Sequence, residues 1–238
     1  MTTHPARQVW QTLEALHDVV YFAPAVRDAG VALGLKGFWD TYFAFRAAPL
    51  GAADVGTVVA TFANFAPGTV ARAVPSAWTR ATPAACLVAR AEVSAAALRT
   101  AGADDEACAI AGDLLEPLLA TADSTGRPLY AANAALALSA DPVARLWQLA
   151  TSMREHRGDG HVALLVAHGI SGLQAHVLQS ARGRFSAEEI TAVRGWTPQD
   201  WSGAVASLEA RGLVVDGALT GSGERLLDEI ERRTDELS

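Results

Sequence analysis

The stretch from Arg154 to His161, which reads Arg-Glu-His-Arg-Gly-Asp-Gly-His, concentrates side chains that can exchange protons. Histidine titrates near neutral pH, and a neighbouring carboxylate can orient the imidazole for general acid–base catalysis. We therefore predict an acid–base site in this stretch. In it, His156 or His161 is the general base, and Asp159 or Glu155 orients the base.

The glycines of this stretch, Gly158 and Gly160, favour a tight loop that presents Asp159 and His161 to a cleft. The same side chains allow a metal site, because His156, Asp159 and His161 offer nitrogen and oxygen donors. However, their spacing is not a strong zinc signature, and the sequence has no HExxH motif. We therefore expect neither a metal nor a cofactor.

A purely structural interpretation of the stretch is also open. Asp159 would cap a helix that begins near Gly160, and Glu155 would be solvated. Arg154 and Arg157 would lie at the C-terminal end of the preceding helix, where the helix dipole favours cations. This interpretation accounts for four charged residues without any function, but it leaves the two histidines unexplained.

An aromatic segment, residues 37–51, supplies the second group of candidate site residues. It reads Gly-Phe-Trp-Asp-Thr-Tyr-Phe-Ala-Phe-Arg-Ala-Ala-Pro-Leu-Gly, which predicts a central helix that is apolar on nearly all sides. Arg46 within it needs a partner, because an unpaired buried charge is costly. That partner is either a carboxylate of this chain (Asp18, Asp40 or Glu155) or an anionic group of a ligand.

We expect an apolar pocket with a few polar groups between this segment and the charged stretch. An alternative is that the aromatic side chains are simply core. The residues predicted to bind a substrate in the pocket are His17, Tyr21, Trp39, Tyr42, Arg46, Asn64 and Arg154.

The elements that must position these residues are helices. Apolar spacing and helix-start signals predict helices over residues 3–21, from Pro24 onward, and over 37–47, 54–65, 84–99, 104–122 and 141–156. Asp104 and Asp141 are the expected N-caps of the last two. No linker divides this part, so we predict a helical bundle domain over residues 1–157.

The remaining residues, 158–238, have a different pattern of elements. A helix over 172–181 precedes two with clear starts: Ser186 with Glu189 forms a capping box, and Thr197 with Pro198 begins the next helix. The dipeptide Asp216-Gly217 between two short apolar pieces predicts a hairpin, and a helix over 223–237 closes the chain. The predicted fold is therefore mainly α, with this short hairpin as its β structure.

The order of these elements resembles the winged helix-turn-helix of the MarR type. The resemblance rests on residues 186–194, on "TPQDWSGAVASLEARGLV" over 197–214, and on 219–230. With "GFWDTYFAFRAAPLG" and "REHRGDGHVALL", the whole chain also resembles a little-characterised bacterial helix-turn-helix family. That resemblance implies a helical domain before the module and no established activity. A winged helix with a long closing helix often pairs, so the resemblance to the winged helix-turn-helix implies a homodimer.

The charges disfavour DNA as the main partner of this module. The formal net charge of the 238-residue chain is −7, whereas proteins that coat nucleic acid are normally basic. The stretch 197–212 holds Asp200 and Glu209 against Arg211, and the wing at 215–218 has no arginine. The basic residues left for phosphate contacts are Arg182, Arg184 and Arg194.

Composition and missing motifs narrow the functional classes to which the protein can belong. The start of the chain lacks the apolar core of a secretory signal, and no apolar run is long enough for a membrane helix, so we expect a cytoplasmic location. No GxGxxG, phosphate loop or GxSxG is present. We predict a small-molecule-binding protein, leaning toward a cofactor-free acid–base enzyme. A ligand-responsive DNA-binding regulator and a structural dimerisation module are the alternatives.

Overall fold

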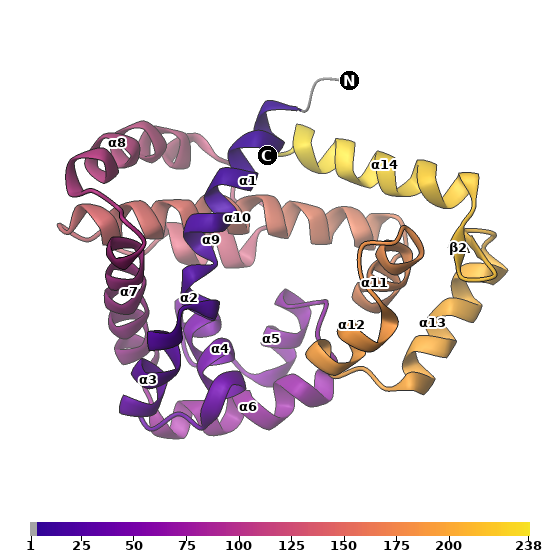
Figure 1. Cartoon of the computed structure of the whole chain (residues 1–238), viewed down its shortest axis with the longest axis horizontal. Helices are drawn as coiled ribbons and strands as arrows, with labels where there is room; N and C mark the ends of the chain where they lie inside the picture. The colour runs from indigo at the N-terminus through magenta and orange to yellow at the C-terminus, as the bar shows by residue number, and fades with distance from the viewer. Residues whose placement is uncertain (1–3) are drawn as a thin grey trace.

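The computed structural model describes residues 4–238 as an almost wholly helical protein (Figure 1). The helices before residue 168 form what we call the helical body. They are α1 (Pro5–His17), α2 (Val19–Phe22), α3 (Pro24–Ala32), α4 (Gly37–Ala47), α5 (Val55–Thr61), α6 (Pro67–Arg80), α7 (Pro83–Thr100), α8 (Asp105–Thr121), α9 (Pro128–Ala134) and α10 (Pro142–Ala167), with a short 3-10 helix η1 (Ala48–Leu50) after α4.

The remaining elements form what we call the C-terminal module. They are α11 (Gly172–Ala181), α12 (Ala187–Arg194), α13 (Pro198–Ala210), β1 (Val214–Val215), β2 (Ala218–Leu219) and α14 (Gly221–Glu236). The strands pair antiparallel, and the turn between them uses positive φ at Asp216 and Gly217. The predicted hairpin and the mainly α fold class are thus confirmed.

Side-chain caps fix where several helices begin, as the sequence predicts. Asp141 accepts hydrogen bonds from two backbone N–H groups of the first turn of α10, both at 2.9 Å. Ser186 and Glu189 cap each other's backbone N–H groups at the start of α12. Thr197 begins α13 in the same way, and Pro198 occupies the first helical position. These bonds satisfy backbone donors that a helix start would otherwise leave unpaired.

Three parts of the helical body differ from the prediction. The predicted helix over residues 3–21 is interrupted at Asp18 between α1 and α2 within the described residues, and residue 3 lies outside them. Helices α6 and α9 were not expected; α6 contains Pro75 in its interior, and α9 is short. In addition, α10 continues well past residue 156, so its length was underestimated.

The loop predicted around Gly158 and Gly160 is wrong, because both glycines lie inside α10. Their role is to leave space. A Cβ atom at Gly160 would lie 3.3 Å from an Nη atom of Arg127, and one at Gly158 would lie 3.4 Å from side-chain atoms of Arg154 and Glu155. Missing side chains here let charged groups pack directly on the helix backbone.

Helix α10 connects two hydrophobic cores. The core of the helical body ends in the sequence at Trp147, and the core of the C-terminal module begins at Leu165. Figure 1 shows α10 crossing the molecule, with α7 and α8 at one end and α11 to α14 at the other. The residues of α10 between the two cores, which include the boundary predicted at 157/158, therefore lie where the two parts meet.

No single helix within residues 4–238 is long and apolar enough to cross a membrane. Three pairs of consecutive helices reach the required length and composition only together, and each pair is bent by 90° to 99°.

Candidate functional site

A cavity of about 430 Å³ lies between the helical body and the C-terminal module. Helices α4 and α10 and the segment after α5 form one side of it, and α11 with the residues up to the end of α12 forms the other. Seven of the residues predicted from the sequence line this cavity: Tyr42, Arg46, Asn64, Arg154, Glu155, Asp159 and His161.

The partner of Arg46 is Glu155. The Arg46 guanidinium donates two hydrogen bonds to the Glu155 carboxylate, at 3.3 and 3.4 Å, and one to Tyr42 Oη at 3.0 Å. Arg154 also contacts Glu155, at 3.0 Å, and reaches Glu14 of α1 at 3.1 Å. Burial by itself raises the pKa of Glu155, but the two arginines outweigh it and lower that pKa to about 2. This wall of the cavity is therefore a closed network of ion pairs.

His161 lines the cavity with a defined tautomer. Its Nδ1 atom lies 3.1 Å from Oγ1 of Thr234 on α14. The Thr234 hydroxyl donates its proton to the carbonyl of Ile230 at 2.7 Å, so it must accept from His161. Nδ1 therefore carries a proton, and Nε2 keeps a free lone pair. Burial lowers the pKa of His161, which keeps the ring neutral at neutral pH.

Asp159 neither caps its own helix nor orients a histidine. Its Oδ2 atom accepts hydrogen bonds from the backbone N–H groups of Leu129 and Tyr130, both at 2.9 Å. It therefore satisfies the first turn of α9 from a neighbouring helix. Burial raises the pKa of Asp159 to about 6. The group that holds His161 is Thr234, which the sequence analysis missed because a lone threonine on a distant helix gives no signal.

The other predicted histidine of the stretch, His156, lies outside this cavity. Its Nε2 atom accepts a hydrogen bond from Arg127 at 3.2 Å, and its ring packs edge-on against Tyr130. It borders a separate cavity of about 680 Å³ beside α1 and the end of α14. Burial lowers the pKa of His156, and the positive charge of Arg127 lowers it further. His156 is therefore neutral and packs against that arginine.

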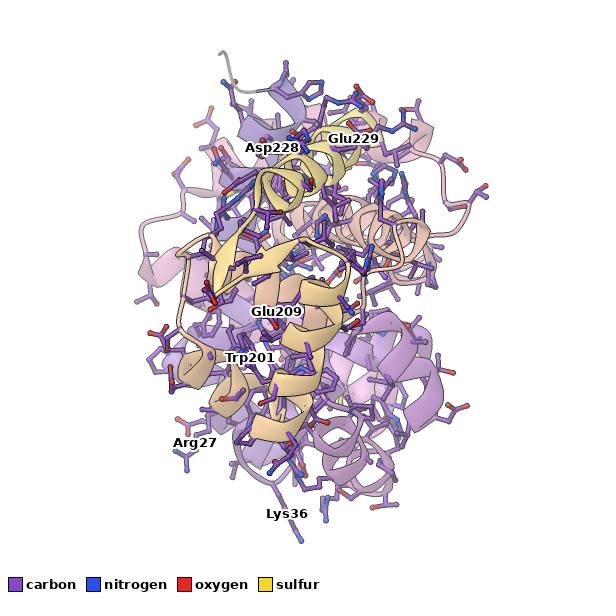
Figure 2. All side chains as sticks on the ribbon, turned by 90° about the vertical axis from the view of Figure 1, so that its right-hand side faces the viewer. Arg27, Lys36, Trp201, Glu209, Asp228 and Glu229 are labelled. Atoms are coloured by element: carbon purple, nitrogen blue, oxygen red, sulfur yellow. The ribbon has the colours of Figure 1, made fainter. Side chains whose placement is uncertain are left out.

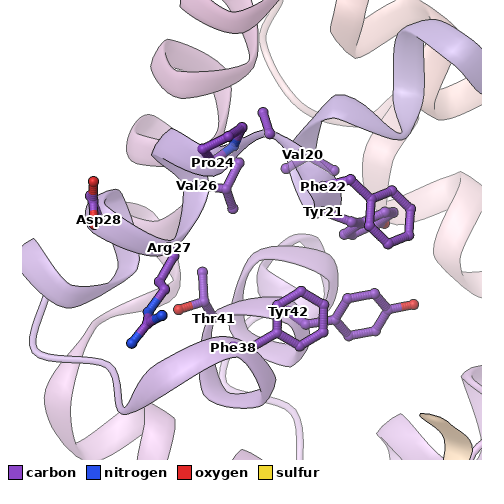
Figure 3. Close-up of a pocket in the computed structure, with 11 residues that line it drawn as sticks. Val20, Tyr21, Phe22, Pro24, Val26, Arg27, Asp28, Phe38, Thr41 and Tyr42 are labelled. Carbon is purple, nitrogen blue, oxygen red and sulfur yellow. The ribbon is translucent and has the colours of Figure 1, made fainter.

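Three further predicted residues also lie away from the central cavity. His17 is fully buried, and its Nδ1 atom lies 3.1 Å from Thr151 Oγ1. Tyr21 lines a different cavity, of about 460 Å³, together with Phe22 and Phe38 (Figure 3). Trp39 packs in the aromatic cluster around Phe65. Among residues 4–238, Tyr42 is the one that lines both cavities.

The wall formed by the C-terminal module is polar and incompletely paired. Arg194 stacks on the Phe65 ring at 4.4 Å, and its Nε atom is buried with no hydrogen-bond partner among residues 4–238. The Oε1 atom of Gln179 is likewise buried with no hydrogen-bond partner among residues 4–238. His176 donates from Nε2 to the carbonyl of Asn64, and burial lowers its pKa to about 4. From the sequence, Arg194 is predicted only as a possible phosphate contact.

The turn between α12 and α13 is fixed to the helical body. Trp196 donates its indole N–H to the carbonyl of Asn64 at 3.1 Å, and Ala66 N–H donates to the carbonyl of Arg194 at 3.0 Å. A Cβ atom at Gly195 would lie 1.9 Å from Thr69 Oγ1, so only glycine fits this contact. The turn between α12 and α13 therefore lies at the wall of the cavity.

The outer face of α13 carries no cation in the described structure. Its exposed residues include Gln199, Asp200, Ser202, Ala206 and Glu209, and Figure 2 shows this helix toward the viewer. This is the face that a recognition helix would turn to DNA.

Two nearby arginines are occupied within the protein. Arg211 donates to the carbonyls of His168 and Gly169, and Arg182 pairs with Glu224 and Asp228. The cations available for phosphate contacts near α13 are therefore fewer than the sequence suggests.

Residues 4–238 also contain no group of three or more histidine, cysteine or acidic side chains placed to hold a metal ion.

Comparison with known proteins places nearly the whole chain in one family. The sequence model of a family described as a helix-turn-helix family matches residues 6–238. No curated protein and no solved structure matches the chain.

Proposed function

The chain belongs to this helix-turn-helix family, and we propose that it binds a small organic anion in the cavity between its helical body and its C-terminal module. The observation that carries the proposal is Arg194. This arginine lines the cavity, has a buried Nε without a partner, and forms no ion pair within residues 4–238. The Arg194 side chain is only partly buried, but it carries a positive charge without a counter-ion among the described residues at the cavity wall, so an anionic group of a ligand is its natural complement.

The distribution of charge around the cavity favours an anion on the side of the module. Four arginines line the cavity, against the carboxylates of Glu155 and Asp159. Arg46 and Arg154 are already committed to Glu155, whereas Arg184 and Arg194 come from the module and have no such partner among the described residues. The local charge is therefore positive in a protein whose net charge is −7.

The rest of the lining suits an aromatic or aliphatic body. Trp10, Phe62, Phe185, Val162 and Leu165 supply the apolar surface of the wall. A volume of about 430 Å³ lies within the usual range for small-molecule sites, in which an apolar lining carries a few placed polar groups.

His161 adds an acid–base capability to the same cavity. The free lone pair on Nε2 can accept a proton from a bound ligand, and the resulting imidazolium keeps its Nδ1–H bond to Thr234. We therefore extend the proposal to proton abstraction from an acidic C–H of the anion. Exchange of that ligand proton with D₂O, followed by NMR, would be faster with the wild-type protein than with the His161→Phe variant.

Thermal unfolding with a panel of small molecules tests the binding proposal. Aromatic and aliphatic carboxylates and phosphate esters are compared with uncharged amides of the same shape. A ligand that binds only the folded state raises the melting temperature according to its concentration and affinity. We expect anions to raise it and their amides not to. Equal effects of both sets, or no effect of any anion, would contradict the proposal.

The second candidate function is a ligand-responsive DNA-binding regulator of the MarR type, acting as a homodimer. Family membership favours it, as does the position of Arg194 at the end of α12, where a bound anion would act directly on the helix-turn-helix. The acidic outer face of α13 disfavours it. In a regulator, the cavity would be the inducer site.

A further inference from the structure

A second arginine, Arg90 of α7, is buried without a carboxylate. Its side chain is part of the core of the helical body, and only 3% of the residue is exposed. Its guanidinium donates to the carbonyl of Phe45 at 3.0 Å, to Asn133 Oδ1 at 2.9 Å and to Gln148 Oε1 at 3.0 Å. All three acceptors are neutral, so the positive charge is solvated by dipoles but is not compensated.

The donors of Arg90 are also not all used. A guanidinium has five N–H donors, and three of them form the bonds just described. The Nε atom is buried and has no partner within residues 4–238. Burial lowers the pKa of Arg90 to about 10, which reflects the cost of this uncompensated charge.

Arg90 lies at a groove that is separate from the central cavity. The groove has a volume of about 820 Å³ and runs between α7, the segment after α9 and the first turns of α10. Gln148 lines it beside Arg90, and most of the remaining wall is apolar, from Ala84, Leu87, Val88, Ala91, Ala95, Ala96, Leu136, Ala137 and Ala144. The other lining residues are Glu92, Arg99, Ser139 and Asp141. None of these residues lines the cavity of the proposed function.

We propose that this groove binds a molecule with an apolar body and one carboxylate, and that the carboxylate replaces the Gln148 side-chain oxygen on Arg90. The exchange gives Arg90 the charged, bidentate partner that guanidinium groups favour. The alanine-rich wall then covers the apolar body. The site is independent of the central cavity and of any chemistry at His161.

A competing cation at the groove makes the assignment testable. Arg99 lines the same groove, but it is exposed and pairs with Asp105 and Asp141. Arg90 is the only arginine of the described groove lining that lacks a carboxylate partner. If Arg99 held the ligand, its removal would matter most, whereas our assignment predicts little effect.

The probes are decanoate and decanamide, titrated into the full-length protein by isothermal calorimetry. We expect decanoate to bind at least tenfold more tightly than the amide. Gln148→Glu supplies a carboxylate next to Arg90 and should weaken decanoate binding at least tenfold. Ala91→Phe narrows the groove at a residue that is not a hydrogen-bond partner of Arg90, and should have the same effect. Arg99→Gln should change the affinity less than threefold.

Three results would overturn the proposal. They are equal binding or no binding of the two probes, wild-type affinity in Ala91→Phe, and loss of binding in Arg99→Gln. Melting temperatures of the variants show whether each is folded. The Ala91→Phe variant tests whether the groove binds decanoate even if Gln148→Glu does not fold.

Discussion

Arg194, the last residue of α12, holds its guanidinium carbon 4.4 Å from the centre of the Phe65 ring. The contact joins the first helix of the helix-turn-helix to the helical body at the edge of the central cavity. The aromatic face stabilises the cation without neutralising it. A ligand that binds there would touch both parts of the protein at once.

Replacing Arg194 by methionine should weaken the binding of organic anions in the central cavity about tenfold to a hundredfold. Methionine keeps most of the contact with Phe65 but loses the charge-assisted hydrogen bonds, which contribute about 1.5–3 kcal/mol. Calorimetric titration with an anion found in the thermal screen measures the change. Arg182→Met is the matched control, since Arg182 pairs with Glu224 and Asp228 and does not line the cavity. A similar loss in both variants would argue against a specific role for Arg194.

Glu155→Gln should destabilise the protein by about 3 kcal/mol at pH 7, because it leaves Arg46 and Arg154 without their shared carboxylate. The pKa of Glu155 is about 2 in the folded protein against 4.5 for an ordinary glutamate. Its contribution is therefore fully present above pH 4.5 and is lost as the pH falls toward 2.

Urea unfolding of the wild-type protein and of the Glu155→Gln variant between pH 2 and 7 tests this dependence of stability on pH. The difference between wild-type and Glu155→Gln should shrink steadily below pH 4.5. Glu209→Gln, on the exposed face of α13, serves as the control. A difference that is independent of pH would show that the ion pairs do not hold the carboxyl group in its charged form.

Thr234→Val should remove the hydrogen bond that fixes the tautomer of His161. In the wild-type protein the threonine hydroxyl accepts from Nδ1, so NMR of the ring nitrogens should show Nδ1 protonated and Nε2 free at pH 7. Valine has a similar shape but no acceptor, so the Nε2–H form should become populated. Thr234→Ser keeps the hydroxyl and should retain the wild-type spectrum. An Nε2–H form in the wild type would refute the hydrogen-bond assignment.

Binding to mixed DNA fragments should be undetectable at physiological salt. Phosphate contacts supply most non-specific affinity, and the outer face of α13 offers Asp200 and Glu209 but no cation among its described residues. Fluorescence anisotropy across a range of salt concentrations measures this. Tight binding that weakens steeply with salt would instead favour the regulator, with the central cavity as its inducer site.

Local signals in the sequence were sufficient for most helix starts and for the hairpin. Asp141, Ser186 and Thr197 act on N–H groups within three residues, so their effect does not depend on the rest of the fold. The Asp216-Gly217 turn is local in the same sense. The segment 37–47 forms the central apolar helix that its composition predicts.

Contacts between segments that are distant in the sequence could not be predicted from local sequence signals. Gly160 lies inside α10, where its missing side chain leaves room for Arg127, 33 residues earlier in the chain. Asp159 caps α9 rather than its own helix, and His161 is held by Thr234 from the last helix. Similarly, the sequence offered three carboxylates as partners of Arg46, and only the tertiary structure selects Glu155.

The central claim is that the cavity between the helical body and the C-terminal module binds an organic anion through Arg194. A crystal structure of the protein with the tightest-binding anion of the thermal screen tests it most directly. We predict that the anionic group lies within hydrogen-bond distance of the Arg194 guanidinium and that its body faces His161 and Phe62. A ligand found outside this cavity, or inside it with its charge directed away from Arg194, would contradict the account.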